Sequence, residues 1–291
     1  EQLWDWIVPA LLCLVGYIVL RWAYPYPATY FDSFTYLRAA IDDQFSIFRP
    51  FGFSEWLRVI HAVSPSIHAL FVVQTLLYAL CTTLLILALK RCYPIRPAWL
   101  RWLISVLIVA SPVAFYMLNA IMSDALFGCM VILMIAMLMV VFHEGSYIAL
   151  LLYFVAFTIA LFTRYSGMFF AVVLLPILCF VPHKPCRWIS LIGTALICVV
   201  FYQNICNHMY DTIRHRQFST GFDGWQLANN AIHIIPFIDS DADEQPSDKD
   251  MRMLHDITCT HFRDYICQKT DSGEVATAVF MWDKQSPLKQ Y

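Results

Sequence analysis

Seven apolar segments, separated by polar turns and one larger polar insert, constrain the fold of this chain more than any other feature of its sequence. The hydrocarbon core of a bilayer is about 30 Å thick, so a helix needs roughly 20 apolar residues to cross it. Lipid offers no hydrogen-bond partners to the backbone, so a membrane span must pair its own N–H and C=O groups, as a helix does. We therefore predict an all-α polytopic membrane protein with about seven transmembrane helices, at residues 6–20, 67–89, 102–118, 125–142, 147–162, 168–181 and 188–205.

The composition indicates the same class of protein. Of the 291 residues, 60% are hydrophobic and 14% are charged, which is far from the usage of a soluble domain of this length. The net charge of -2 and the absence of a basic run argue against nucleic-acid binding. The ten cysteines form no CxxC pair, which argues against a zinc or redox framework. The partner that the composition predicts is the lipid bilayer.

The positive charges predict the orientation in the membrane. Lys90, Arg91, Arg96 and Arg101 follow the second apolar segment with no acidic residue among them. Loops that are rich in Lys and Arg stay on the cytoplasmic side. The N-terminus is then cytoplasmic, and the insert at 23–64 lies on the outer face. The turns at Asp124 and Arg164 are expected on the same face.

The insert at 23–64 carries the first candidate for chemistry, Asp32. We predict two short helices here, at 34–42 with Asp32 or Ser33 as N-cap, and at 53–62 along the membrane surface. A carboxylate at the mouth of a membrane bundle is costly, which favours a functional role. An N-cap or a solvated loop charge is the alternative. Tyr36 follows Asp32 by four residues, so both side chains should share one helix face.

Two further charged residues are expected at the same face. Asp124 follows Ser123 at the start of the fourth span, where a carboxylate is also favoured by the helix dipole alone. Arg164 ends the fifth span, where it could bind phosphate with its bidentate guanidinium or snorkel to the interface. Arg49, before Pro50, is a second candidate for phosphate.

The C-terminal part of the chain has the composition of a soluble segment. Residues 208–291 contain thirteen acidic residues against eight Lys and Arg. We predict a division into a transmembrane module, 1–207, and an outer-face extension, 208–291, with helices within 221–235 and 251–268. The acidic run at 239–244 lacks the glycine and the terminal glutamate of a calcium-binding loop, so a solvated loop is the preferred interpretation.

The motifs of the insert resemble those of the GT-C superfamily of membrane glycosyltransferases, in the style of protein O-mannosyltransferases and lipid A aminoarabinose transferases. Asp32, Ser33 and Tyr36 are similar to its Asp-Ser-x-x-Tyr in a large loop after the first span. The Arg-Pro-x-Gly that begins at Arg49 and ends at Gly52 is similar to the motif that follows.

The resemblance continues along the chain to residue 207. Ser123-Asp124 resembles the Ser-Asp/Glu that opens the fourth span in that superfamily. Thr163-Arg164 with Gly167 resembles its Thr-Arg-x-x-Gly between the fifth and sixth spans. Members have more spans and a fuller C-terminal domain, so by this resemblance the chain is expected to be C-terminally incomplete.

The resemblance implies a glycosyltransferase of the bacterial inner membrane with its active site facing the periplasm. It would move a sugar from a polyprenyl-phosphate donor to a hydroxyl of a glycan, lipid or protein acceptor. Asp32 would be the general base of an inverting transfer, and Asp124 would assist by orienting an arginine or the acceptor. Arg49 and Arg164 would hold the lipid phosphate.

The same resemblance assigns Tyr36 and Ser33 to donor binding. The insert has no second acid beside Asp32, so a divalent metal stays open as an alternative but is not favoured, and no cofactor is assigned. A transporter or a lipid-binding protein without catalysis is the alternative, but it should carry charges at mid-membrane depth. A polymerase or ligase of lipid-linked glycans is a further alternative, although those enzymes keep their large polar loop late in the chain.

Overall fold

The computed structural model describes residues 2–43, 49–94, 97–218 and 252. The chain divides into two units, Glu1–Phe218 and Ser219–Tyr291, and the fold described below is that of the first unit. The predicted helices within 221–235 and 251–268 and the acidic run at 239–244 lie, apart from Arg252, outside the described residues.

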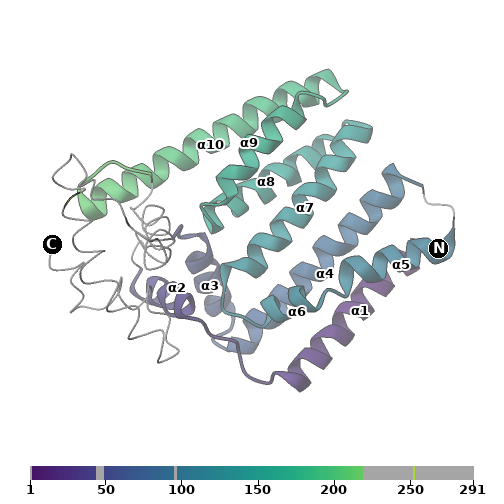
Figure 1. The fold of residues 1–291 in the computed structure, drawn as a ribbon, viewed down its shortest axis with the longest axis horizontal. Helices are drawn as coiled ribbons and strands as arrows, with labels where there is room; N and C mark the ends of the chain where they lie inside the picture. Colours follow the sequence, from purple (N-terminus) through teal and green to yellow (C-terminus); the bar gives the residue numbers. More distant parts are fainter. Residues whose placement is uncertain (1, 44–48, 95–96, 219–251, 253–291) are drawn as a thin grey trace, which may run out of the picture. The chain divides into compact units, whose positions relative to one another are not determined.

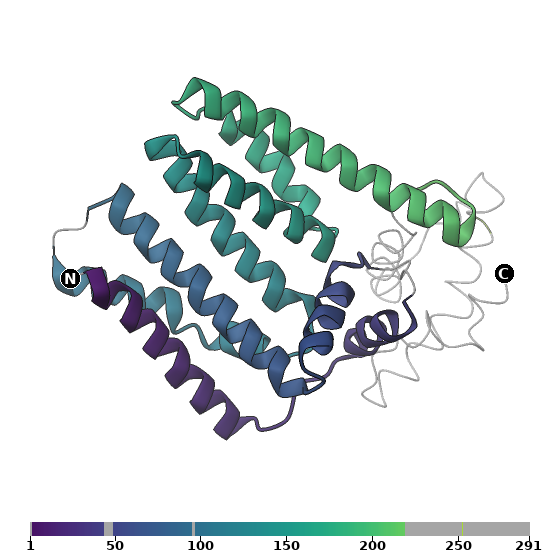
Figure 2. The ribbon, with the colours of Figure 1, turned by 180° about the vertical axis from the view of Figure 1, so that it is seen from behind.

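Helices form nearly all regular structure in the described residues. A single isolated β-bridge, between Ala28 and Ala120, is the exception there. The longer helices lie side by side in both views of the molecule, and the two short helices of the insert lie at one end of them (Figures 1 and 2). In chain order the helices are α1 (Gln2–Ala23), α2 (Phe31–Asp42), α3 (Gly52–Val63), α4 (Ile67–Cys92), α5 (Ala98–Val109), α6 (Pro112–Leu118), α7 (Ser123–Glu144), α8 (Tyr147–Thr163), α9 (Gly167–Leu178) and α10 (Lys184–Ile213).

The all-helical membrane architecture predicted from the sequence is confirmed, but only five of the seven predicted spans are long enough, among the described residues, to cross a membrane. Five helical stretches in the described residues are long and apolar enough to cross a membrane, namely Trp6–Ala23, Ile67–Cys92, Trp99–Leu118, Ser123–Glu144 and Lys184–Thr212. The fifth and sixth predicted spans correspond to α8 and α9, which are apolar but shorter, at 17 and 12 residues. At 1.5 Å per residue, α9 is only about 18 Å long, less than the thickness of a bilayer core.

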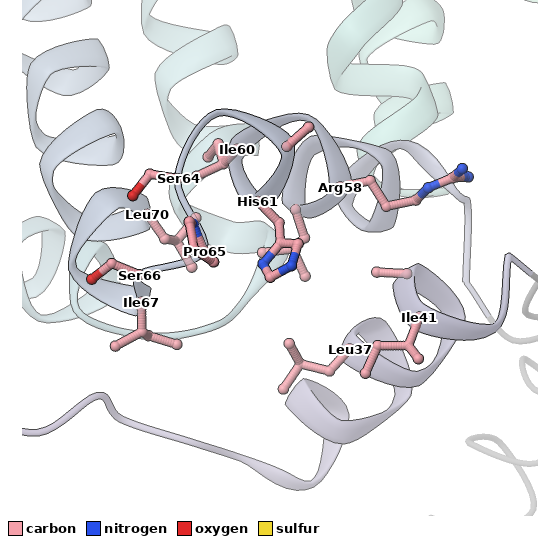
Figure 3. Close-up of a pocket in the computed structure, with 13 residues that line it drawn as sticks. Leu37, Ile41, Arg58, Ile60, His61, Ser64, Pro65, Ser66, Ile67 and Leu70 are labelled. Atoms are coloured by element: carbon pink, nitrogen blue, oxygen red, sulfur yellow. The ribbon is translucent and has the colours of Figure 1, made fainter.

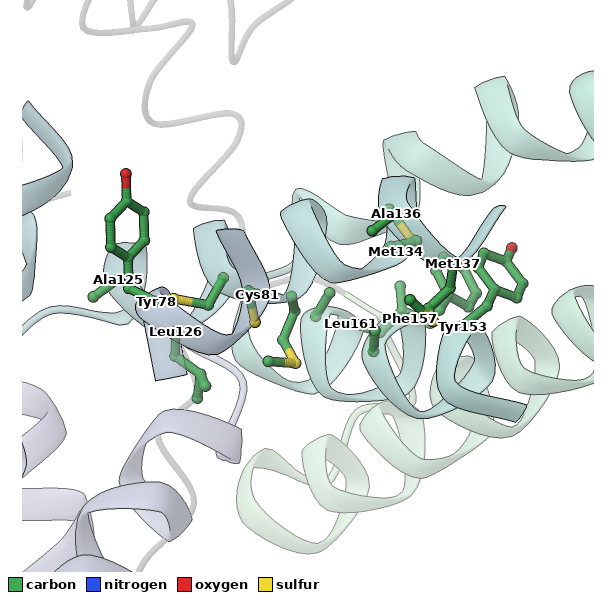
Figure 4. Packing of buried hydrophobic residues seen from close by; sticks show 14 of the residues in the cluster. Tyr78, Cys81, Ala125, Leu126, Met134, Ala136, Met137, Tyr153, Phe157 and Leu161 are labelled. Atoms are coloured by element: carbon green, nitrogen blue, oxygen red, sulfur yellow. The ribbon is translucent and has the colours of Figure 1, made fainter. Parts of the chain in front are cut away.

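The core of the bundle lies where α7 packs between α4 and α8. Small residues line this contact, with Ala136 of α7 and Ala156 of α8 fully buried. Small side chains allow helix backbones in membranes to approach closely. Larger side chains fill the remaining space, and Figure 4 shows Tyr78 and Cys81 of α4, Met134 of α7 and Phe157 of α8 in this cluster.

The third span is broken into α5 and α6, and Tyr78 of α4 binds backbone carbonyl groups at the break. Pro112 has no backbone N–H, so the carbonyl of Ile108 loses its helical partner. The Tyr78 hydroxyl lies 3.1 Å from the carbonyl oxygens of both Ile108 and Val109, to which it can donate. Pro112 thus separates α5 from α6, and the carbonyls at this break have a specific hydrogen-bond partner.

The start of α2 corrects one prediction. The helix begins at Phe31, with Tyr30 as N-cap, instead of at residue 34 with Asp32 or Ser33 as N-cap. Ser33 is the third helical residue, and its Oγ accepts the backbone N–H of Tyr30 at 2.9 Å, which satisfies a donor that the helix leaves unpaired. Asp32 lies in the first turn, where the helix dipole favours its charge. The second predicted helix, at 53–62, is confirmed as α3.

Candidate functional site

The linker between α1 and α2 is fixed to the turn between α6 and α7. The backbone N–H of Ala28 donates to the carbonyl of Asn119 at 3.0 Å, and that of Ile121 donates to the carbonyl of Ala28 at 3.1 Å. Arg21, at the end of α1, donates to Oδ1 of Asn119 at 2.9 Å, and the Asn119 amide donates to the Tyr26 carbonyl at 2.9 Å. These contacts hold the approach to α2 beside the start of α7.

Asp32 and Arg49 form the first ion pair of the site. An Arg49 Nη2 lies 2.5 Å from Oδ2 of Asp32, and both side chains are partly exposed, at 22% for Arg49 and 34% for Asp32. The same guanidinium lies over the ring of Tyr36, 5.6 Å from its centroid. Arg49 thus contacts both residues, which confirms that Asp32 and Tyr36 share one face of α2. A cation over an aromatic face is attracted to it.

Asp124 and Arg164 form the second ion pair. Asp124 is the second residue of α7 and Arg164 follows the last residue of α8, and Nη1 of Arg164 donates to Oδ1 of Asp124. These side chains are also partly exposed, at 31% for Arg164 and 35% for Asp124. Oδ2 of Asp124 is buried and has no hydrogen-bond partner among the described residues. The Arg164 guanidinium lies 5.9 Å from the ring centroid of Phe127.

A buried hydrogen bond joins the two ion pairs. The Tyr36 hydroxyl lies 2.9 Å from Oγ of Ser123, the residue before Asp124. Tyr36 is 1% exposed and Ser123 is fully buried. Ser54 of α3 donates to the Tyr36 carbonyl at 3.2 Å, which fixes the middle of α2 to α3. The face of α2 that carries Asp32 is therefore anchored on the N-terminus of α7.

The Arg-Pro-Phe-Gly segment closes the site on its other side. Gly52 lies so close to the end of α8 that an added Cβ would be 2.4 Å from the carbonyl oxygen of Phe162. The ring of Phe51 packs on that of Phe162, with centroids 5.2 Å apart. Phe162 precedes Arg164 by two residues. The segment that holds Arg49 therefore rests on the helix end that holds Arg164.

The structure thus brings all six residues that the sequence singled out to one end of the bundle. Sequence reasoning did not single out Arg21 or Asn119 as positioning residues. Arg21 was interpretable only as an interface cation, because nothing in the sequence indicates that Asn119 would meet it 98 positions later in the chain. The residues that are brought together are Asp32, Ser33, Tyr36, Arg49, Asp124 and Arg164.

An apolar groove of about 580 Å³ lies between α2, α3 and the start of α4, and we call it the α2–α3 groove. Figure 3 shows its side chains: Leu37 and Ile41 from α2, Ile60 and His61 from α3, and Leu70 from α4 are among them. Its lining residues from α2 are Leu37, Ala40 and Ile41, and they do not include Asp32 or Tyr36. Apolar walls with a few polar groups at the rim are typical of sites for hydrophobic ligands.

Two tyrosines near the site have raised pKa values. Burial raises the pKa of Tyr165, whose hydroxyl has no hydrogen-bond partner among the described residues. A hydrogen bond with the Tyr116 hydroxyl, at 2.8 Å, raises the pKa of Tyr30. Within the described ranges, no three His, Cys, Asp or Glu side chains lie close enough together to hold a metal ion.

Comparisons with models of protein families, with curated proteins and with solved structures found no match to this chain. Its candidate site is therefore defined by its own geometry: two carboxylate–guanidinium pairs at one end of a bundle of apolar helices, beside an apolar groove.

Proposed function

We propose that this protein is a membrane glycosyltransferase that moves a sugar from a polyprenyl-phosphate donor to a hydroxyl acceptor. The observation that carries the proposal is the pairing of Asp32 with Arg49 and of Asp124 with Arg164 at one end of the bundle. A base and two phosphate-binding cations are what this reaction requires, and here they stand beside a groove suited to a hydrocarbon chain.

Asp32 is the proposed general base. Its carboxylate would take the proton of the acceptor hydroxyl as that oxygen attacks the anomeric carbon of the sugar. The bond from the anomeric carbon to the phosphate oxygen then breaks, and the configuration at that carbon inverts. Positioned base catalysis contributes about 10²–10⁴-fold to a rate. The partly exposed position of Asp32 supports this role, because an acceptor can approach it.

Arg49 and Arg164 are the proposed ligands of the leaving phosphate. A guanidinium has five N–H donors in a planar fork, so one edge can remain on a carboxylate while the other binds phosphate. Cations that face a developing phosphate charge stabilise the transition state strongly in a site that excludes water. Asp124 would then orient Arg164, which agrees with the hydrogen bond between them.

The α2–α3 groove is the proposed site for part of the polyprenyl chain. Its walls are apolar, and Ile41 at its edge is 80% exposed, as expected for a surface that meets lipid. Counting α8 and α9 as crossings gives seven spans in total. The N-terminus is then cytoplasmic and the candidate site faces the periplasm of a bacterial inner membrane, in agreement with the cations after α4.

The deciding experiment is a transfer assay with a radiolabelled polyprenyl-phosphate sugar in proteoliposomes, comparing wild type with Asp32→Asn. We expect the variant to lose about 10²–10⁴-fold in rate, because the amide cannot accept the proton. Asp42→Asn is the matched control, since Asp42 lies on the same helix and, among the described residues, forms an ion pair with the exposed Arg38 alone. It should transfer at the wild-type rate.

Full activity in a folded Asp32→Asn variant would remove the general-base assignment. If wild type binds the donor but transfers no sugar to any acceptor, the chain is instead a lipid-binding protein, the alternative that the α2–α3 groove favours.

A further inference from the structure

The two ion pairs of the candidate site belong to different parts of the chain, and one hydrogen bond connects them. Asp32 and Arg49 come from the insert, whereas Asp124 and Arg164 come from the ends of α7 and α8. The Tyr36 ring lies under the Arg49 guanidinium, and the Tyr36 hydroxyl contacts Oγ of Ser123, beside Asp124. Tyr36 therefore contacts Arg49 of the first ion pair with its ring and, with its hydroxyl, the residue that precedes Asp124 of the second.

Burial makes this connection specific. Tyr36 is 1% exposed and Ser123 is fully buried, so neither side chain can replace its partner with water without a local opening. A buried polar group that loses its partner destabilises the fold, because water cannot replace the lost hydrogen bond. The ring of Phe53 packs edge-on against Tyr36, with centroids 4.9 Å apart, and prevents the ring from turning away. Contacts with Arg49, Phe53 and Ser123 thus fix the orientation of the Tyr36 side chain.

We propose that Tyr36 and Ser123 are positioning residues that hold the two ion pairs at a fixed separation, so that a change at one pair is felt at the other. The sequence resemblance assigns Tyr36 to donor binding; its burial and its contact with Ser123 give it this second, mechanical task. The use of that separation in sugar transfer rests on the proposed function. The coupling itself does not, because it is a property of the folded protein.

The test is a double-mutant cycle of Asp32→Asn and Asp124→Asn, read as shifts of the midpoint of thermal unfolding in nanodiscs. The cycle is measured in wild type and in Tyr36→Phe, which removes only the hydroxyl. Tyr153→Phe is the matched control background, because Tyr153 is equally buried and its hydroxyl makes the corresponding contact, 3.0 Å from Oγ1 of Thr194. Non-additive shifts measure coupling between the two sites.

We expect the non-additivity to be the same in wild type and in Tyr153→Phe, and to fall by half or more in Tyr36→Phe. Direct attraction between the charges is unchanged by the loss of a hydroxyl, so the difference between the two backgrounds isolates the link. Equal non-additivity in all three backgrounds would overturn the proposal, as would additive shifts in wild type. If Tyr36→Phe does not fold, Ser123→Ala removes the same bond from the other side.

A second reading uses binding of decaprenyl phosphate, measured by native mass spectrometry. In wild type the loss of affinity in Arg49→Ala combined with Arg164→Ala should differ at least threefold from the product of the single losses. In the Tyr36→Phe background, the affinity loss of the double variant should equal the product of the two single losses. If wild type does not bind decaprenyl phosphate, the proposed function fails, and the unfolding cycle still decides whether Tyr36 couples the two pairs.

Discussion

Each carboxylate of the site has one arginine, and each arginine lies near an aromatic ring. Arg49 contacts Asp32 and the ring of Tyr36, and Arg164 contacts Asp124 and lies near the ring of Phe127. The nearby ring and the paired carboxylate both restrict the orientation of the guanidinium. The remaining edge is then preorganised for an anion, which reduces the ordering cost of binding.

The planar shape of Arg164 is expected to matter as much as its charge. Arg164→Lys keeps the positive charge near Asp124 but loses the second donor edge, and a hydrogen bond between charged groups contributes about 1.5–3 kcal/mol. We expect donor affinity to fall by roughly 10- to 100-fold, as measured by titration with decaprenyl phosphate. Arg38→Lys, at an 86% exposed side chain on α2, is the control and should bind normally. Normal binding by Arg164→Lys would show that only charge is needed.

The buried hydroxyl of Tyr165 predicts a dependence of stability on pH. Burial raises the pKa of Tyr165 in the folded protein above the value of about 10 in the unfolded chain. The stability contributed by the neutral phenol is therefore complete below about pH 10 and is lost as pH rises toward the folded pKa. Tyr165→Phe cannot ionise, so its unfolding midpoint should exceed that of wild type by more at pH 10.5 than at pH 8.

At pH 8 the Tyr165→Phe variant should unfold at or slightly above the wild-type midpoint, because the removed hydroxyl has no hydrogen-bond partner among the described residues. A midpoint difference that stays constant between pH 8 and pH 10.5 would mean that Tyr165 titrates like a free phenol.

Among the elements, the approach of the insert to α8 depends on one glycine. An alanine at position 52 would place its Cβ 2.4 Å from the backbone oxygen of Phe162, and backbone cannot move aside as a side-chain tip can. We expect Gly52→Ala to displace the Arg49 segment from α8 and to cost about 1–3 kcal/mol of stability, the usual cost of overpacking. Thermal unfolding and binding of decaprenyl phosphate measure the two effects.

Gly128→Ala is the control for this substitution. Gly128 lies inside α7, and nothing would lie within 4 Å of its added Cβ. Alanine is preferred over glycine in a helix interior by about 1 kcal/mol, so this variant should be unchanged or more stable. Equal stability of Gly52→Ala and wild type would show that the insert can retreat from α8 without loss.

At the scale of the whole molecule, the direction of the bundle in the membrane can be tested by cysteine labelling. Arg38→Cys on α2 and Tyr93→Cys after α4 introduce thiols at exposed positions near opposite ends of the bundle. We expect a membrane-impermeant maleimide to label Arg38→Cys in intact spheroplasts and Tyr93→Cys only after lysis. Cys179 is exposed, so it is first replaced by Ser in every variant. The quantity measured is the labelling that each introduced cysteine adds to that of the Cys179→Ser protein. The reverse pattern would place the candidate site in the cytoplasm.

Much of the architecture could be predicted from the sequence, because long apolar runs have few stable arrangements in lipid. The break at Pro112, the helix start at Ser123-Asp124 and the helix of Gly52–Val63 all follow from local chemistry. The start of α2 was missed by three residues, since Ser33 acts as third helical residue and not as N-cap. The length of α9 was overestimated, because the apolar run continues past the helix end into a turn.

The sequence by itself determined that the chain is an all-helical membrane protein and that Asp32, Arg49, Asp124 and Arg164 lie between its apolar segments. Only the tertiary structure decided which carboxylate pairs with which arginine. It also decided that Tyr36 is buried against Ser123 and that Gly52 lets the insert rest on α8. The physical reason is that apolar periodicity is a local property, whereas an ion pair between residues 40 positions apart depends on how whole helices pack.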